Sequence, residues 1–213
     1  MAEPPGYITP SSDMPPRPLT ESEAQDVFAA IAAMGDRIAF RYLLEGCESR
    51  AQLMIEELLA SGISPGRAWA VMVGRPLVVP SPDAPKRLIK WLNHTAPTVA
   101  LDATLDGVRV IDPGVTAKGV LTLADWATAM GTRSVLISEV PLSQEQILAM
   151  QRERALAGLE LDAILFHLPL GQAPIPEKGG SGFGIGPDPA EGSGSFARRK
   201  MAEYLTRQQP GDK

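Results

Sequence analysis

Cysteine, histidine and basic runs are scarce in this sequence. Its 213 residues contain one cysteine, Cys47, and two histidines, His94 and His167. A single cysteine excludes internal disulfides, a CxxC redox pair and zinc sites built from several thiolates, so we expect no metal and no cofactor. The net charge of -5 comes without a basic block that could follow a phosphate backbone, so nucleic acid is not an expected partner.

The sequence also has no long hydrophobic run. No stretch of 18 apolar residues is present, and residues 1–13 have neither the positive nor the apolar region of a signal peptide. We expect no membrane partner and a soluble chain without a Sec leader, which is cytoplasmic or exported by a leaderless route. The oligomeric state is not readable from the sequence.

Glycine and proline are abundant instead, with 20 of each. They concentrate near the ends of the chain, which predicts three parts. We expect a flexible proline-rich arm over 1–18, a catalytic domain over 19–170, and a flexible Gly/Pro-rich segment with a short C-terminal helix over 171–213.

Capping residues and apolar spacing predict the elements of the central part. Helices are expected after Thr20, from the turn that holds Cys47 to Gly62, after Thr122 and after Ser143, and a short helix over 196–207. Strands are expected over 68–73, 87–92, 95–101, 108–111, 134–138 and 162–168, with a tight turn at Asp106-Gly107 and an exposed loop over 76–85.

Three residues stand out as a set with catalytic potential. Cys47 lies in the first turn of a helix, where the helix dipole lowers the pKa of a thiol and favours the nucleophilic thiolate. His94 lies between two strand runs, and Asp112 ends the next strand along the chain. Since hairpin strands are neighbours, Asp112 is placed to orient a His94 imidazole that exchanges a proton with the thiol. Each residue also has an ordinary structural explanation, as a buried Cys, a satisfied His and a turn-forming Asp-Pro pair.

The local sequences around these residues resemble the bacterial protein-glutaminases. The nucleophile segment of that family is similar to residues 38–54, IAFRYLLEGCESRAQLM, and its histidine strand to 91–99, WLNHTAPTV. Its aspartate segment is similar to 110–113, VIDP, and a Trp-bearing helix to 123–126, LADW. The resemblance covers about residues 19–131.

This resemblance implies an α+β fold with a papain-like, transglutaminase-related core, in which a central antiparallel sheet packs against helices. It also implies hydrolysis of the side-chain amide of protein-bound glutamine. Cys47 would be the nucleophile, His94 the general acid and base, and Asp112 the orienting carboxylate of a triad that acts through a thioester. The partner would be a protein with an exposed glutamine, and Trp91 is a candidate for substrate binding. Gln52 departs from the family pattern, which has His at this position. Since no leader is recognisable, a bacterial effector that modifies one target protein by the same chemistry is also an expectation.

Other functions of the same residues stay open. The triad also fits a cysteine protease or isopeptidase, or transglutaminase-type acyl transfer to an amine. A degenerate member of the family would instead use the inherited site as a protein-binding module.

Overall fold

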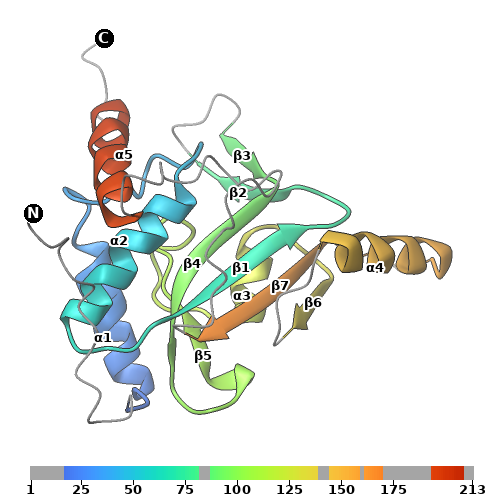
Figure 1. Ribbon diagram of the computed structural model, residues 1–213, viewed down its shortest axis with the longest axis horizontal. Helices are drawn as coiled ribbons and strands as arrows, with labels where there is room; N and C mark the ends of the chain where they lie inside the picture. The colour runs from blue at the N-terminus through green and yellow to red at the C-terminus, as the bar shows by residue number, and fades with distance from the viewer. Residues whose placement is uncertain (1–16, 82–86, 139–143, 159–160, 170–192, 209–213) are drawn as a thin grey trace, which may run out of the picture.

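The protein combines helices with two β-sheets in a mixed α+β arrangement (Figure 1). The computed structural model describes residues 17–81, 87–138, 144–158, 161–169 and 193–208. In chain order the elements are α1 (Glu21–Ala32), α2 (Cys47–Ala60), β1 (Gly66–Met72), β2 (Leu77–Pro80), β3 (Leu88–Trp91), β4 (Asn93–Ala100), the 3-10 turn η1 (Leu105–Gly107), β5 (Val108–Val110), α3 (Leu123–Ala129), β6 (Val135–Ser138), α4 (Gln144–Leu156), β7 (Ala163–Pro169) and α5 (Ser193–Gln208).

The larger sheet has the strand order β5-β4-β1-β7-β6. Neighbouring strands are antiparallel except for β6 and β7, which are parallel, so the sheet is mixed and not the antiparallel sheet that we expected. The physical reason is the connection: α4 lies between β6 and β7, and a strand-helix-strand crossover returns the chain in the same direction. Strands β2 and β3 form a separate antiparallel pair.

Alternating side chains let the larger sheet pack on both faces. Ala68 and Ala70 of β1 lie in a core cluster with α3 and the β2-β3 pair, whereas Trp69 and Val71 lie in another with Ile147 of α4. A third cluster joins α1, α2 and α5, which gather on one side of the molecule in Figure 1. The contact of α2 with β4 brings the N-terminus of α2 toward the strand that carries His94.

Two helices begin at the capping residues that the sequence indicates. Thr20 and Glu23 form a reciprocal capping box, in which the Glu23 amide donates to Thr20 Oγ1 (3.2 Å) and the Thr20 amide donates to Glu23 Oε2 (2.7 Å). Thr122 accepts from the amide of Asp125 at the start of α3. The predicted strands over 68–73, 134–138 and 162–168 are likewise confirmed as β1, β6 and β7.

Three local predictions need correction. The interval 76–85 is not simply an exposed loop, because Leu77 and Val79 of β2 are buried. Asp106-Gly107 does not form a two-residue turn; it lies in η1, at the end of a longer connection between β4 and β5. His94 is not between strands, since β4 already begins at Asn93.

Several predicted segments lie outside the described residues. These include most of the 1–18 arm, the cap at Ser143 and residues 170–192 of the C-terminal segment. The three-part division of the chain therefore stays a prediction, although α5 packs in the same cluster as α1 and α2. No helix within the described ranges is both long and apolar enough to cross a membrane.

Candidate active site

Cys47 is the first residue of α2. The preceding residue, Gly46, adopts a left-handed conformation (φ 83°), which turns the chain sharply into the helix. Met54, Ile55 and Leu58 are buried and fix α2 against the rest of the core. The thiol is half-buried and lies at the positive end of the helix dipole.

His94 and Asp112 come together through the pairing of β4 and β5. Thr98 lies opposite Val110, and the Ile111 amide donates to the carbonyl of Pro97, so the same register places Asp112 beside Ala96. His94 lies two residues before Ala96 in β4, so its side chain is on the same face of the sheet as that of Asp112. Its Nε2 lies 2.8 Å from Asp112 Oδ2, and both residues are buried.

Three donors hold the Asp112 carboxylate. Oδ2 accepts from His94 and from Nε1 of Trp126 (2.8 Å), while Oδ1 accepts from the amide of Gly114 (3.2 Å). Trp126 is fully buried in α3, so its indole is fixed by the core. Hydrogen bonds to a carboxylate favour its charged form. Burial acts in the opposite direction, but the charge and hydrogen bond of His94, followed by Trp126 and Arg50, keep the pKa of Asp112 below its ordinary value.

Trp91 stacks on His94. The ring centroids are 4.2 Å apart and the planes differ by 8°, and Nε1 of Trp91 donates to the carbonyl of Leu43 (2.7 Å). The three-residue spacing of Trp91 and His94 does not fit one strand face, and the structure explains this: Trp91 ends β3, and Leu92 separates it from β4. Trp91 and Trp126 thus both contact the imidazole ring.

The thiol and the imidazole influence each other's charge. Burial alone would raise the pKa of Cys47, but the neighbouring His94 and, more weakly, the charge of Arg50 together lower it below its ordinary value. Burial likewise opposes the imidazolium, yet Asp112 and, more weakly, Cys47 raise the pKa of His94 to about 9. Because Asp112 occupies Nε2, Nδ1 is the nitrogen available to the thiol, and this buried atom has no hydrogen-bond partner among the described residues. The arrangement favours a thiolate beside an imidazolium.

Arg50 is a buried cation that the sequence analysis does not single out. Its Nη1 donates to the carbonyls of Tyr42 (2.6 Å) and Glu45 (2.9 Å), in the turn just before Cys47. Periodicity contains the signal for it, because Arg50, Met54 and Leu58 are spaced four apart on the buried face of α2. The sequence contains no such signal for the hydrogen bond from Trp126 to Asp112, because a buried Trp fits the pattern of an ordinary core residue.

Gln52 forms hydrogen bonds with residues outside this group. Its Oε1 accepts from Arg67 (3.1 Å), and its Nε2 donates to Glu56 (3.2 Å). No group of three or more His, Cys, Asp or Glu side chains is arranged to hold a metal ion within the residues that the structure describes.

Comparison with known protein families gives a match to a family described as glutaminase, over residues 24–130. The chain belongs to this glutaminase family. The resemblance seen in the sequence is thereby confirmed, and the matched residues contain Cys47, His94, Asp112 and Trp126. The glutaminase match ends before β6, so α4, β7 and α5 lie beyond it.

Solved structures of protein-glutaminases are similar to this chain at low identity. A crystal structure of protein-glutaminase is 18% identical, with 78% of this chain and 96% of that chain covered and a TM-score of 0.42. The protein-glutaminase from Chryseobacterium proteolyticum, solved by NMR, is 23% identical (51% and 61% covered, TM-score 0.42). A pro-protein-glutaminase crystal structure is 22% identical (60% and 46% covered, TM-score 0.45), so this chain spans about half of its length. A search of curated proteins finds no significant match.

Proposed function

We propose that this protein hydrolyses the side-chain amide of protein-bound glutamine and releases ammonia. Cys47 is the nucleophile in this proposal, His94 the general acid and base, and Asp112 the carboxylate that orients His94. Membership of the glutaminase family supports the reaction. The single observation that carries the residue roles is the buried His94-Asp112 pair beside a thiol whose pKa is lowered.

The reaction divides into two steps at the glutamine Cδ. The Cys47 thiolate attacks Cδ, and the oxygen becomes an oxyanion that the backbone N–H of Cys47, at the start of α2, is placed to stabilise. His94 then gives its proton to the departing nitrogen, which leaves as ammonia and yields a γ-glutamyl thioester. In the second step His94 removes a proton from water, whose oxygen attacks the thioester and releases glutamate and free Cys47.

Asp112 and the two tryptophans support His94 in these proton transfers. The Asp112 carboxylate accepts from Nε2, which leaves Nδ1 as the nitrogen that exchanges protons with sulfur, ammonia and water. Trp91 stacks on the imidazole and shields it from solvent, and we propose that its position also lets it contact the substrate. A helix N-terminal thiol that faces a strand histidine is the papain-like arrangement we propose for this core.

Ammonia release from a glutamine-rich protein tests the proposal. The wild type is expected to release ammonia, and Cys47→Ala to abolish release while its circular dichroism spectrum stays unchanged. Arg198→Ala, at an exposed ion pair on α5, provides a matched control that keeps activity. Mass spectrometry of the substrate identifies the reaction: deamidation replaces NH₂ by OH at glutamine, proteolysis shortens the chain, and transamidation adds an amine. A wild type that is inert on such substrates, or that gives either of the other products, contradicts the proposal.

A further inference from the structure

The turn over residues 42–46 determines where the Cys47 thiol lies. From inside, the buried Arg50 holds this turn by bonding the carbonyls of Tyr42 and Glu45. Gly46 completes it in the left-handed conformation that leads directly into α2. Arg50 is also one of the charges that lower the pKa of Cys47, so the backbone of this turn and the charge beside the thiol are coupled.

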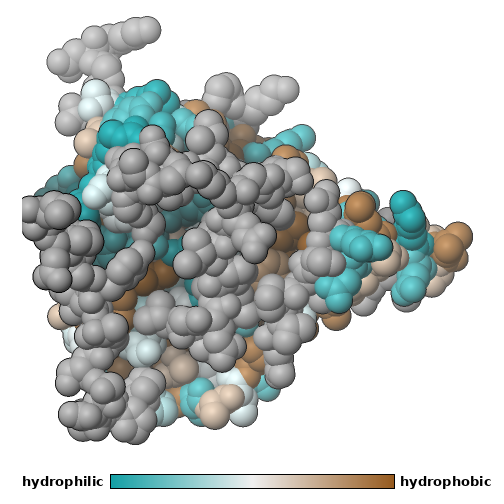
Figure 2. Space-filling view, in the orientation of Figure 1, coloured by the Kyte–Doolittle hydropathy of each residue, from teal (hydrophilic) through white to brown (hydrophobic). Residues whose placement is uncertain are grey.

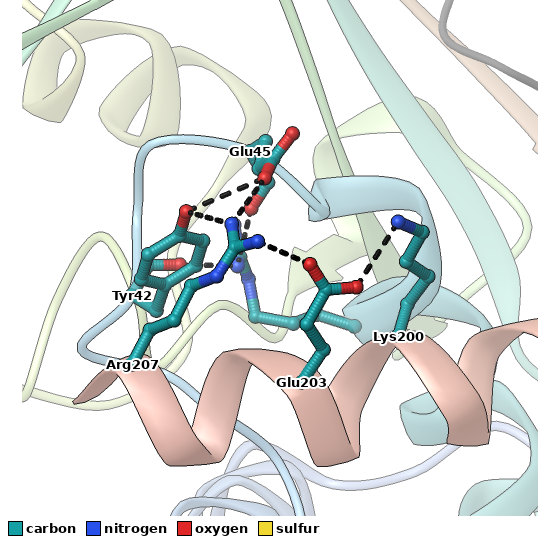
Figure 3. Close-up of polar contacts among 6 residues, drawn as sticks. Tyr42, Glu45, Lys200, Glu203 and Arg207 are labelled. Carbon is teal, nitrogen blue, oxygen red and sulfur yellow. Dashed lines mark hydrogen bonds and ion pairs between the residues drawn. The ribbon is translucent and has the colours of Figure 1, made fainter. Parts of the chain in front are cut away.

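Helix α5 covers the same turn from outside (Figure 3). The ring of Tyr204 stacks on that of Tyr42, with centroids 4.8 Å apart and planes 17° apart. The Tyr204 ring also lies against Gly46 so closely that a Cβ at this position would collide with it. Tyr204 therefore touches the turn both at its first and at its last residue.

Arg207 of α5 binds two side chains of the turn. Nη1 donates to Tyr42 Oη (3.0 Å) and to Glu45 Oε1 (3.2 Å), and the guanidinium lies 5.9 Å from the centre of the Tyr42 ring. Its other nitrogen bonds Glu203 on the same helix, which in turn bonds Lys200 (3.2 Å). Figure 3 shows Arg207 directed toward Tyr42 and Glu45, with Glu203 between Arg207 and Lys200 on the same helix.

The rest of α5 is built to dock on the core. Ala197, Met201 and Tyr204 are buried at helical spacing, while the visible face over α5 is mainly hydrophilic (Figure 2). The helix lies outside the segment that matches the glutaminase family, and about 150 residues separate it from the turn that it covers. Nothing in the proposed reaction assigns a role to it.

We propose that α5 is part of the active centre, with Tyr204 and Arg207 as positioning residues that hold the 42–46 turn and thereby the Cys47 thiol. This inference rests on the proposed function for its catalytic meaning. When α5 is held in place, the carbonyls of Tyr42 and Glu45 stay where Arg50 binds them, and the guanidinium of Arg50 stays beside Cys47. When α5 is loosened, the turn and Arg50 are free to move, so the thiol loses an attraction that opposes the effect of burial on its pKa.

Alkylation of Cys47 by iodoacetamide as a function of pH tests the inference, since this is the one cysteine of the chain. Arg207→Ala and Tyr204→Ala are expected to shift the pH profile upward. A shift of one unit lowers the thiolate fraction, and hence the alkylation rate below both pKa values, about tenfold. Tyr204→Phe keeps the ring that stacks on Tyr42 and covers Gly46, so this variant should have the same pH profile as the wild type.

Arg198→Ala is the matched control. Arg198 lies on the same helix and bonds Glu56 of α2 (2.8 Å), away from the turn, so its removal should leave the profile unchanged. The inference is overturned if Arg207→Ala and Tyr204→Ala alkylate as the wild type does while α5 stays folded by circular dichroism. It is also overturned if all alanine variants, Arg198→Ala included, slow in proportion to their loss of thermal stability. Alkylation needs no glutamine substrate, so a protein that fails the ammonia assay but shows the shift refutes the proposed function alone.

Discussion

The charge of His94 depends chiefly on Asp112, and Asp112→Asn isolates this dependence. The substitution keeps the shape of the side chain but removes the charge that contributes most to raising the pKa of His94 from the ordinary 6.5 to about 9. That difference corresponds to about 3 kcal/mol in favour of the imidazolium. Burial, which opposes the imidazolium, remains in the variant, so we expect its His94 to titrate at about 6.5 or below.

The consequence at pH 7.5 is large. With a pKa of about 9, about 97% of His94 is protonated; with a pKa of about 6.5, about 10% is protonated. The thiolate of Cys47 then loses its neighbouring cation, so alkylation and glutamine hydrolysis should both slow at this pH. Titration of ¹⁵N-labelled imidazole rings by NMR measures the effect directly. His167, whose pKa burial lowers, serves as a control in the same spectra and should not change.

Stability is a poorer measure than this titration, for a reason of sign. The raised pKa of His94 alone contributes stability below about pH 6.5 that is lost as the pH rises through about 9. The lowered pKa of Cys47 acts in the opposite direction, because its contribution is present at high pH and lost as the pH falls through the folded value. The two partly cancel. If His94 in Asp112→Asn still titrates near 9, the electrostatic explanation of the site is wrong.

Three further substitutions test other parts of the structure. Trp126→Phe keeps a ring in the core but removes the donor to Asp112. We expect kcat to fall about tenfold, because a hydrogen bond to a charged group contributes about 1.5 kcal/mol or more; an unchanged kcat contradicts this role. Gly46→Ala introduces a left-handed alanine against the Tyr204 ring and should reduce both Cys47 alkylation and the melting temperature, whereas wild-type values refute the turn geometry. Thr20→Ala removes the cap of α1 and should cost about 1 kcal/mol in urea unfolding with activity unchanged.

The sequence predicts much of the site because its signals are local. A thiol at a helix start follows from the apolar spacing after Cys47, and the adjacency of His94 and Asp112 follows from consecutive strands. What it misses depends on contacts between distant segments. The stack of Trp91 on His94 requires a break between strands at Leu92, and the parallel pairing of β6 with β7 depends on a crossover through α4.

The C-terminal region illustrates the same limit most clearly. Composition predicts a short helix after a Gly/Pro-rich segment, and α5 confirms the helix. Composition contains no information on where such a helix docks, because its buried residues are compatible with many apolar surfaces. Only the fold brings Tyr204 and Arg207 to the turn before Cys47.

The separation of α5 from Cys47 along the chain has a consequence during translation. The ribosome adds about 150 residues after Cys47 before α5 begins, which takes roughly 7 to 30 s at ordinary elongation rates. Throughout that time the nascent protein contains Cys47 and the strands of His94 and Asp112, but not the helix that packs over the 42–46 turn. If α5 positions the thiol as we propose, Cys47 reaches its full reactivity only after α5 has been synthesised and has packed on this turn.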